Sequence, residues 1–191
     1  IPADVAKDAG INIASRIASN NYNAGILAGQ YMLDNLPAGS KVAVVEGMAG
    51  NSSGQARHDG FVDTVTAGGF EVVASQPADW DRAKANGVVT NVLQANPEVA
   101  GIYFANDTMA LGGIEAVEAA GLGGKLVLIG TDAIPEALQA VKDGRLAGTV
   151  AQFPYEEAVI CVENAIKLLE GRPIPTKIDA PIKLMLKADV E

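Results

Sequence analysis

Unbroken apolar runs alternate with longer helical patterns along almost the whole of this chain, and this alternation limits the folds available to it. The clearest runs are VAVVE, GIYFA and LVLIG. Runs that are apolar throughout, rather than at every second residue, are typical of strands covered on both faces, as in a parallel sheet. Short connections between strand and helix then favour right-handed crossovers. The pattern predicts an α/β fold with a doubly wound, mostly parallel sheet and helices on both faces.

The expected elements can be placed from the spacing of apolar residues and from the capping residues, Gly and Pro that mark where helices begin and end. We expect strands at Lys41–Glu46, Phe70–Ser75, Ala100–Ala105, Leu126–Gly130, Ala147–Gln152 and Ile182–Lys187. We expect helices at about Asn20–Asn35, Ser53–Ala67, Asp81–Ala95, Asp107–Ala120, Ile134–Lys142 and Tyr155–Glu170. Asn, Ser or Asp stands near the start of each helix, as N-caps often do.

Composition excludes several classes of function. The 191 residues are 49% hydrophobic, and 14 Lys and Arg face 23 Asp and Glu, for a net charge of −9. An acidic chain without a basic patch is a poor partner for nucleic acid. The single Cys and single His exclude disulfide frameworks and zinc sites built from these residues. No cofactor or metal is expected. The chain opens without Met or a signal-like segment, so we expect a processed or trimmed product.

Polar side chains gather after the expected strands, which is where ligands bind in open α/β sheets. They are Asn51, Arg57, Asp79, Asp81, Arg82, Asn106, Asp107, Thr131, Asp132 and Gln152, together with the only Trp of the chain, Trp80. Asp and Arg can each hold two hydroxyls, and an indole face packs on sugar C–H groups. This edge has no evident nucleophile. The combination predicts a monosaccharide site.

Each of these residues also has a plainer interpretation. Asp79, Asp107 and Asp132 stand where helices begin, and we favour capping over ligand contact for Asp79 and Asp107. Asp132 stays open because Pro135 sets the helix start close by. Arg57 fits a solvated surface charge and Trp80 fits a core residue. The convergence on one edge, rather than any single residue, supports the site.

An enzyme alternative rests on Gly50–Gly54, which matches the G-x-S-x-G pattern of a hydrolase nucleophile elbow. A true elbow turns directly off the strand, but three residues separate Glu46 from this motif. The only His, His58, follows too closely to be the distant base of such an enzyme. We interpret the match as chance, and no phosphate-binding G-x-x-x-x-G-K-[ST] motif occurs.

Five segments resemble the ribose/allose-type periplasmic sugar-binding proteins, in order and over nearly the whole chain. They are EGMAGNSSGQARHDGF, SQPADWDR, FANDTMALGG, GTDAIPEA and TVAQFP. The resemblance implies a non-enzymatic type I receptor with flavodoxin-like lobes, which closes on one monosaccharide in the periplasm. It also implies delivery to an ABC-type permease and, for some members, to a chemoreceptor.

The resemblance assigns roles to individual residues. Hydrogen bonds to sugar hydroxyls are implied for Arg57, Asn106, Asp132 and Gln152. Trp80 would stack on the ring, Met48 and Thr131 would line the pocket, and Ser19 would lie near a hinge crossing. Trp80 and the NSSGQAR segment are more similar to the allose-binding branch than to the ribose-binding branch. The identity of the sugar stays open.

The resemblance also implies a domain plan in which the first lobe is largely missing. Residues 1–19 would be its remnant with a hinge crossing, 20–152 the second lobe, 153–176 a helix completing the first lobe, and 177–191 a strand returning to the second. The 155–170 helix would then expose an apolar face. We expect it either to fold back onto the remaining sheet or to bury this face in another copy as a homo-oligomer, and a frayed tail is the plainer alternative. A sugar-responsive repressor core is the alternative. Such a core would follow a basic helix-turn-helix, but Lys7 is the one basic residue before Ile11.

Overall fold

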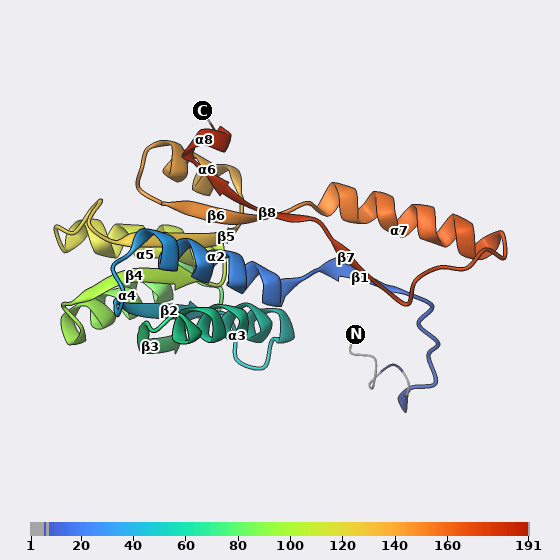
Figure 1. Cartoon of the computed structure of the whole chain (residues 1–191), viewed down its shortest axis with the longest axis horizontal. Coiled ribbons are helices and arrows are strands. Elements are labelled where there is room, and N and C mark those ends of the chain that lie inside the picture. The colour runs from blue at the N-terminus through green and yellow to red at the C-terminus, as the bar shows by residue number, and fades with distance from the viewer. Residues whose placement is uncertain (1–5, 7, 191) are drawn as a thin grey trace. The chain divides into compact units, whose positions relative to one another are not determined.

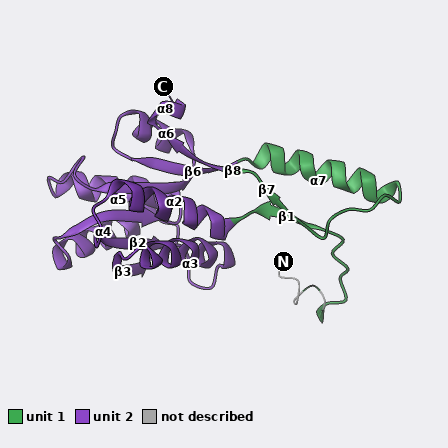
Figure 2. Cartoon of the chain, viewed as in Figure 1, with its two compact units in different colours: residues 1–20, 153–182 green, residues 21–152, 183–191 purple. Residues whose placement is uncertain are grey.

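The computed structural model describes residue 6 and residues 8–190, and the chain forms two compact units (Figure 2). Unit 1 consists of Ile1–Asn20 and Phe153–Ile182, and unit 2 of Asn21–Gln152 and Lys183–Glu191. The chain therefore passes between the units three times. Each unit is built from segments distant in sequence, so neither is a simple N-terminal or C-terminal half.

Unit 2 is built on a six-stranded sheet in the order β3-β2-β4-β5-β6-β8 (Figure 1). Its strands are β2 (Lys41–Glu46), β3 (Glu71–Pro77), β4 (Val99–Phe104), β5 (Val127–Asp132), β6 (Gly148–Gln152) and β8 (Ile182–Leu186). The pairings of β2 with β3 and β4, of β4 with β5 and of β5 with β6 are all parallel. The predicted α/β fold with a mostly parallel sheet is confirmed.

The helices of unit 2 are α2 (Asn21–Asn35), α3 (Ser52–Ala67), α4 (Arg82–Ala95), α5 (Asp107–Ala119), α6 (Pro135–Lys142) and α8 (Lys187–Val190). Consecutive residues of the central strands turn to opposite faces. On one face Tyr103 stacks on Phe61 of α3, with ring centroids 4.7 Å apart. On the other, Phe104 joins the core formed with α4 and α5. Both faces are therefore covered, which explains the unbroken apolar runs.

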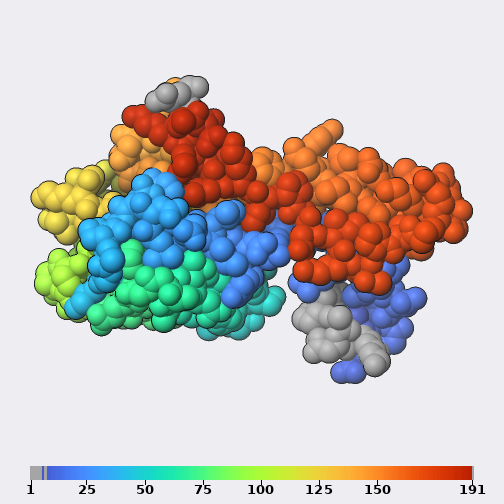
Figure 3. All heavy atoms as spheres, in the orientation of Figure 1, coloured from blue at the N-terminus to red at the C-terminus, as the bar shows by residue number. Residues whose placement is uncertain are grey.

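Helices α2 and α3 meet with their backbones almost in contact, and Figure 3 shows their spheres side by side. A methyl group at Gly25 would lie 2.1 Å from the carbonyl oxygen of Arg57. One at Gly60 would lie 2.0 Å from the carbonyl oxygen of Tyr22. Only glycine leaves room at both positions, so the spacing of these helices is fixed at its minimum.

Unit 1 pairs β1 (Arg16–Ser19) with β7 (Lys177–Ala180) in a parallel two-stranded sheet, against which α7 (Pro154–Leu169) packs. Neither strand is predicted from the sequence, because both are four residues long and lack a buried apolar run. Residues 177–191 were expected as one returning strand. In the structure this segment is divided, with β7 in unit 1 and nearly all of β8 in unit 2.

Candidate functional site

A hollow of about 240 Å³ opens at the carboxyl ends of the central strands of unit 2. It is lined by Asn51, Ser53, Arg57, Trp80, Asn106 and Asp132. Enclosed small-molecule sites usually measure about 300–1,000 Å³, so this hollow is smaller than a typical enclosed site. The predicted residues Arg57, Trp80, Asn106 and Asp132 thus come together from α3, the β3–α4 loop, the start of α5 and the end of β5.

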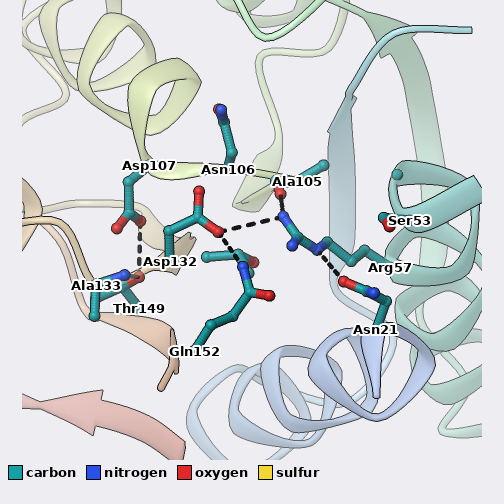
Figure 4. A network of polar contacts seen from close by, with 12 residues as sticks. Asn21, Ser53, Arg57, Ala105, Asn106, Asp107, Asp132, Ala133, Thr149 and Gln152 are labelled. Carbon is teal, nitrogen blue, oxygen red and sulfur yellow. Dashed lines mark hydrogen bonds and ion pairs between the residues drawn. The ribbon is translucent and has the colours of Figure 1, made fainter. Parts of the chain in front are cut away.

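Arg57 is held by three groups at the back of the hollow (Figure 4). Its Nε donates to Asn21 Oδ1 at 2.8 Å, and its Nη1 donates to the carbonyl oxygen of Ala105 at 2.6 Å. Nη1 also lies 3.5 Å from Asp132 Oδ1. With 7% of its surface exposed, Arg57 is not the solvated surface charge that the sequence left open.

Asp132 turns its carboxylate toward Arg57 and Gln152 from an unusual backbone conformation. Its φ is 123° and that of Ala133 is 57°, values that L-residues rarely adopt. Gln152 Nε2 donates to Asp132 Oδ1 at 2.6 Å. Burial raises the pKa of Asp132, while Arg57 and the Gln152 hydrogen bond oppose that rise. Both contacts use Oδ1, so within the described residues Oδ2 remains available to accept a hydrogen bond.

Trp80 lies half-buried over the backbone of the β2–α3 connection. A methyl group at Gly47 would lie 2.1 Å from Trp80 Cη2, and one at Gly54 would lie 3.0 Å from it. Trp80 and the preceding Asp79 both have positive φ, 64° and 53°. This conformation, together with the two glycines, places the indole beside the hollow rather than wholly within the core.

The structure corrects the helix caps. The side chain of Asp81 caps α4, and that of Asn106 caps α5 by accepting from Met109 N at 2.9 Å. The expected caps at Asp79 and Asp107 are therefore wrong. Asp132 does not cap α6 either, since Ile134 is the N-cap and has no side-chain cap bond. Asn106 uses Oδ1 for the cap, which leaves its Nδ2 as a donor at the hollow.

The remaining predicted site residues do not line the hollow. Thr131 is fully buried, and its hydroxyl lies 3.0 Å from that of Tyr103. Thr131 therefore stands behind the site, without exposed surface. Met48 is exposed in the β2–α3 connection, and Ser19 is buried at the end of β1 in unit 1. Gln152 reaches the site through Asp132.

Two contributors, Asn21 and Ser53, were not among the side chains expected at this edge, and Asn51 was expected there without a role of its own. Asn51 accepts from the amides of Ser53 and Gly54 as the N-cap of α3. Ser53 precedes Arg57 by four residues, and this spacing places both on one face of a helix. That spacing was the available signal. The Asn21–Arg57 hydrogen bond joins two helices, and no local sequence pattern predicts it.

Within the described residues, the single His does not complete the hydrolase motif at Gly50–Gly54. His58 Nδ1 contacts Asp59 Oδ1 at 2.9 Å, and no hydrogen bond joins it to Ser52 among the residues described. Over the same residues, no group of three His, Cys, Asp or Glu side chains could hold a metal ion. No helix in the described part of the chain has the length and apolarity needed to cross a membrane.

Comparison with known proteins gives consistent relatives. Residues 4–173 match the family model described as periplasmic binding protein domain. The chain is 47% identical to the D-allose-binding periplasmic protein of Escherichia coli over 158 residues, covering 82% of this chain and 51% of that protein. It is 41% identical to the ribose import binding protein of Salmonella typhimurium over 176 residues, covering 92% of this chain and 59% of that protein.

A solved structure agrees with these relatives. A periplasmic solute-binding protein of an ABC transporter from Actinobacillus succinogenes, with bound D-allose, superimposes with a TM-score of 0.91 at 34% identity. The match covers 100% of this chain and 66% of that one. The chain spans about half the length of the curated relatives it matches. It belongs to the periplasmic binding protein domain family.

Proposed function

We propose that the chain contributes one wall of a receptor site for a ribose- or allose-like monosaccharide, which it binds without chemical change. The observation that carries this proposal is the convergence of Arg57, Asp132 and Trp80 on one hollow. A guanidinium and a carboxylate recognise hydroxyl groups, and an indole face recognises sugar C–H groups. The names of the two curated relatives, an allose-binding and a ribose import protein, support the same ligand class.

The unused hydrogen-bonding groups suit a polyhydroxylated ligand. Asp132 Oδ2 would accept from a hydroxyl, while Asn106 Nδ2 and Arg57 Nη2 would donate to hydroxyl or ring oxygens. Sugar hydroxyls both donate and accept, so one ring could pair with all three groups. Trp80 would cover one face of the ring. These groups bind and orient, and the proposal includes no reaction on the sugar.

The wider role belongs to the same proposal. A periplasmic receptor of this kind would release its sugar to an ABC-type permease, and in some settings to a chemoreceptor. Unit 1, including the 153–176 segment, would belong to a first lobe, and unit 2 would be the second. The three passages between the units, near Ser19, near Gln152 and at Ile182, would form the hinge. No observation favours a repressor core or a hydrolase.

Titration of the labelled 191-residue chain with D-allose and D-ribose by NMR tests the proposal. We expect shifts of the Asn106, Asp132 and Gln152 signals with a Kd weaker than about 1 mM, because one wall leaves the ring wet. Asp132→Asn should weaken binding about 5- to 150-fold, the equivalent of about 1–3 kcal/mol. The control Asp143→Asn changes an exposed carboxylate that lies outside the hollow and accepts from Gln139.

Two outcomes would contradict this proposal. The first is the absence of localised shifts with either sugar up to several hundred millimolar. The second is an unchanged affinity in a folded Asp132→Asn variant. A micromolar Kd for this chain would instead show that a second wall is unnecessary.

A further inference from the structure

Asp107 is a fully buried carboxylate that lies behind the hollow and outside its lining. We propose that Asp107 is a positioning residue: it holds the backbone of Asp132–Ile134 in its strained form and so aims the Asp132 carboxylate into the hollow. The geometric part stands on the structure alone, whereas the consequence for ligand binding rests on the proposed sugar-binding function.

Asp107 contacts Thr149 on β6, as Figure 4 shows, and the segment just after Asp132. Its Oδ2 accepts from the Ile134 amide at 3.0 Å, and its Oδ1 accepts from Thr149 Oγ1 at 2.7 Å. Thr149 Oγ1 in turn accepts from the Ala133 amide at 3.2 Å. Asp107 therefore holds residue 134 directly and residue 133 through Thr149. The first residue of α5 is thereby tied to both β6 and the β5–α6 connection.

This anchoring acts where the backbone most needs it. Asp132 and Ala133 are consecutive non-glycine residues with positive φ. Such conformations cost on the order of 1–3 kcal/mol each and persist only where neighbours impose them. If the amides of Ala133 and Ile134 were released, the segment would relax and the Asp132 side chain would leave its present direction. Its contacts with Arg57 and Gln152 depend on that direction.

The chain leaves little freedom for Asp107 itself. A methyl group at Gly130 would lie 2.1 Å from Asp107 Oδ1. Position 130 therefore admits only glycine while the carboxylate keeps its place. The same observation supplies an independent perturbation: Gly130→Ala should displace Asp107 without altering its charge.

The ionised form of Asp107 suits this role because its partners are all donors toward it. Protonation would place a hydroxyl hydrogen against these donors. Burial raises the pKa of Asp107 to about 6, with the nearby Asp132 charge adding to the rise and the Thr149 and Ile134 bonds opposing it. The segment should therefore be held above about pH 6 and loosen below it.

Charged groups on the surrounding elements enter the same titration. Asp132 on β5 is itself paired with Arg57 of α3. Tyr103 on β4 is neutral here, because burial raises its pKa to about 12. Arg82 and Glu136, at the starts of α4 and α6, form an ion pair of 2.7 Å. Asp107 and Asp132 are the two groups whose raised pKa values must be separated by experiment.

The test compares wild type with Asp107→Asn, Gly130→Ala and the exposed control Asp143→Asn. Without ligand, we expect the Ala133 and Ile134 amides to exchange at least tenfold faster in the first two variants, while core amides of β4 stay protected. Carboxyl ¹³C NMR should show that wild-type Asp107 titrates near pH 6. After correction for the intrinsic pH dependence of amide exchange, the exchange rates of the 133 and 134 amides should rise below that pH in wild type. The corrected rates should not change with pH in Asp107→Asn.

Sugar binding supplies the second readout. D-allose affinity should fall at least fivefold in both variants at pH 7.5, and the wild-type affinity should decline below about pH 6. If Asp107→Asn does not fold, Thr149→Val and its conservative partner Thr149→Ser provide the same contrast, with rescue expected in Ser. Unchanged exchange at 133 and 134 in folded variants overturns the inference. Absence of wild-type sugar binding with accelerated exchange overturns only the proposed function.

Discussion

Helices α5 and α7 are similar in length and rich in apolar residues, yet their surroundings are opposite. Nine of the thirteen residues of α5 are buried, whereas Asn164 is the one buried residue among the sixteen of α7. Gly112 and Gly113 let α5 approach Arg82 and Phe104 closely. In α7, Tyr155, Val159, Val162, Ile166, Leu168 and Leu169 are exposed.

The difference shows that an apolar helix sequence indicates a surface that needs burial, but does not indicate which element will bury it. In unit 2, α5 lies on β4 and β5 and beside α4, and these elements form one continuous core. In unit 1, α7 packs on the short strands β1 and β7. A two-stranded sheet is marginally stable by itself. We therefore expect unit 2 to carry the stability of this chain.

The largest expected effect comes from one isoleucine in each helix. Ile114 of α5 is 2% exposed and Ile166 of α7 is 48% exposed. Ile114→Ala should lower the free energy of unfolding by about 2–5 kcal/mol, and Ile166→Ala by about 0.5 kcal/mol or less. Urea unfolding followed by circular dichroism measures both, and the single Trp reports on unit 2. Equal losses of unfolding free energy in the two variants would contradict the difference proposed between the helices.

A smaller effect concerns aromatic side chains. Trp80 in unit 2 is half-buried beside the hollow, and Tyr155 on α7 is 76% exposed. Trp80→Ala should weaken D-allose binding by about 1–3 kcal/mol, as for other aromatic contacts. Tyr155→Ala is the matched control and should leave the NMR titration unchanged. Equal affinity of wild type and a folded Trp80→Ala variant would assign Trp80 to packing alone.

The smallest expected effect on stability comes from a substitution on α7 that should change self-association of the chain. We propose that the exposed face of α7 self-associates, since exposed apolar patches of this kind favour contact between copies. Val162, 60% exposed, is central to this face, and Val162→Glu should change stability by about 0.5 kcal/mol or less. Sedimentation should show concentration-dependent dimers in wild type but monomers in Val162→Glu. The control Asn91→Glu adds the same charge at an exposed position of α4. A monomeric wild type refutes self-association.

Most helices and strands of unit 2 could be predicted from the sequence because the patterns that indicate them are local. An unbroken run such as VAVVE is typical of a strand buried on both faces, and the loop after it must lie at the carboxyl edge of the sheet. Arg57, Trp80, Asn106 and Asp132 could therefore be expected to meet. Their roles toward a sugar remain predictions.

What sequence could not supply depends on contacts between distant residues or on backbone geometry. Asp79 and Asp81 are equally good caps by composition, and only the positive φ of Asp79 and Trp80 moves the helix start to Asp81. Asp107 looked like a cap, but its bonds cross to residues 134 and 149. Strands β1 and β7 pair across about 160 residues, and neither carries an apolar run that would reveal it.

The backbone contact between α2 and α3 has a thermodynamic consequence for any ligand. Because Gly25 and Gly60 fix the helix spacing, Asn21 on α2 is held where it meets Arg57 on α3. The rotamer entropy of this long side chain is therefore lost during folding, and a ligand need not order it again. Selectivity among sugars should therefore change more readily by substitutions in the connection that carries Met48 and Asn51 than by substitution of Arg57. Replacing Arg57 would disturb two helices at once.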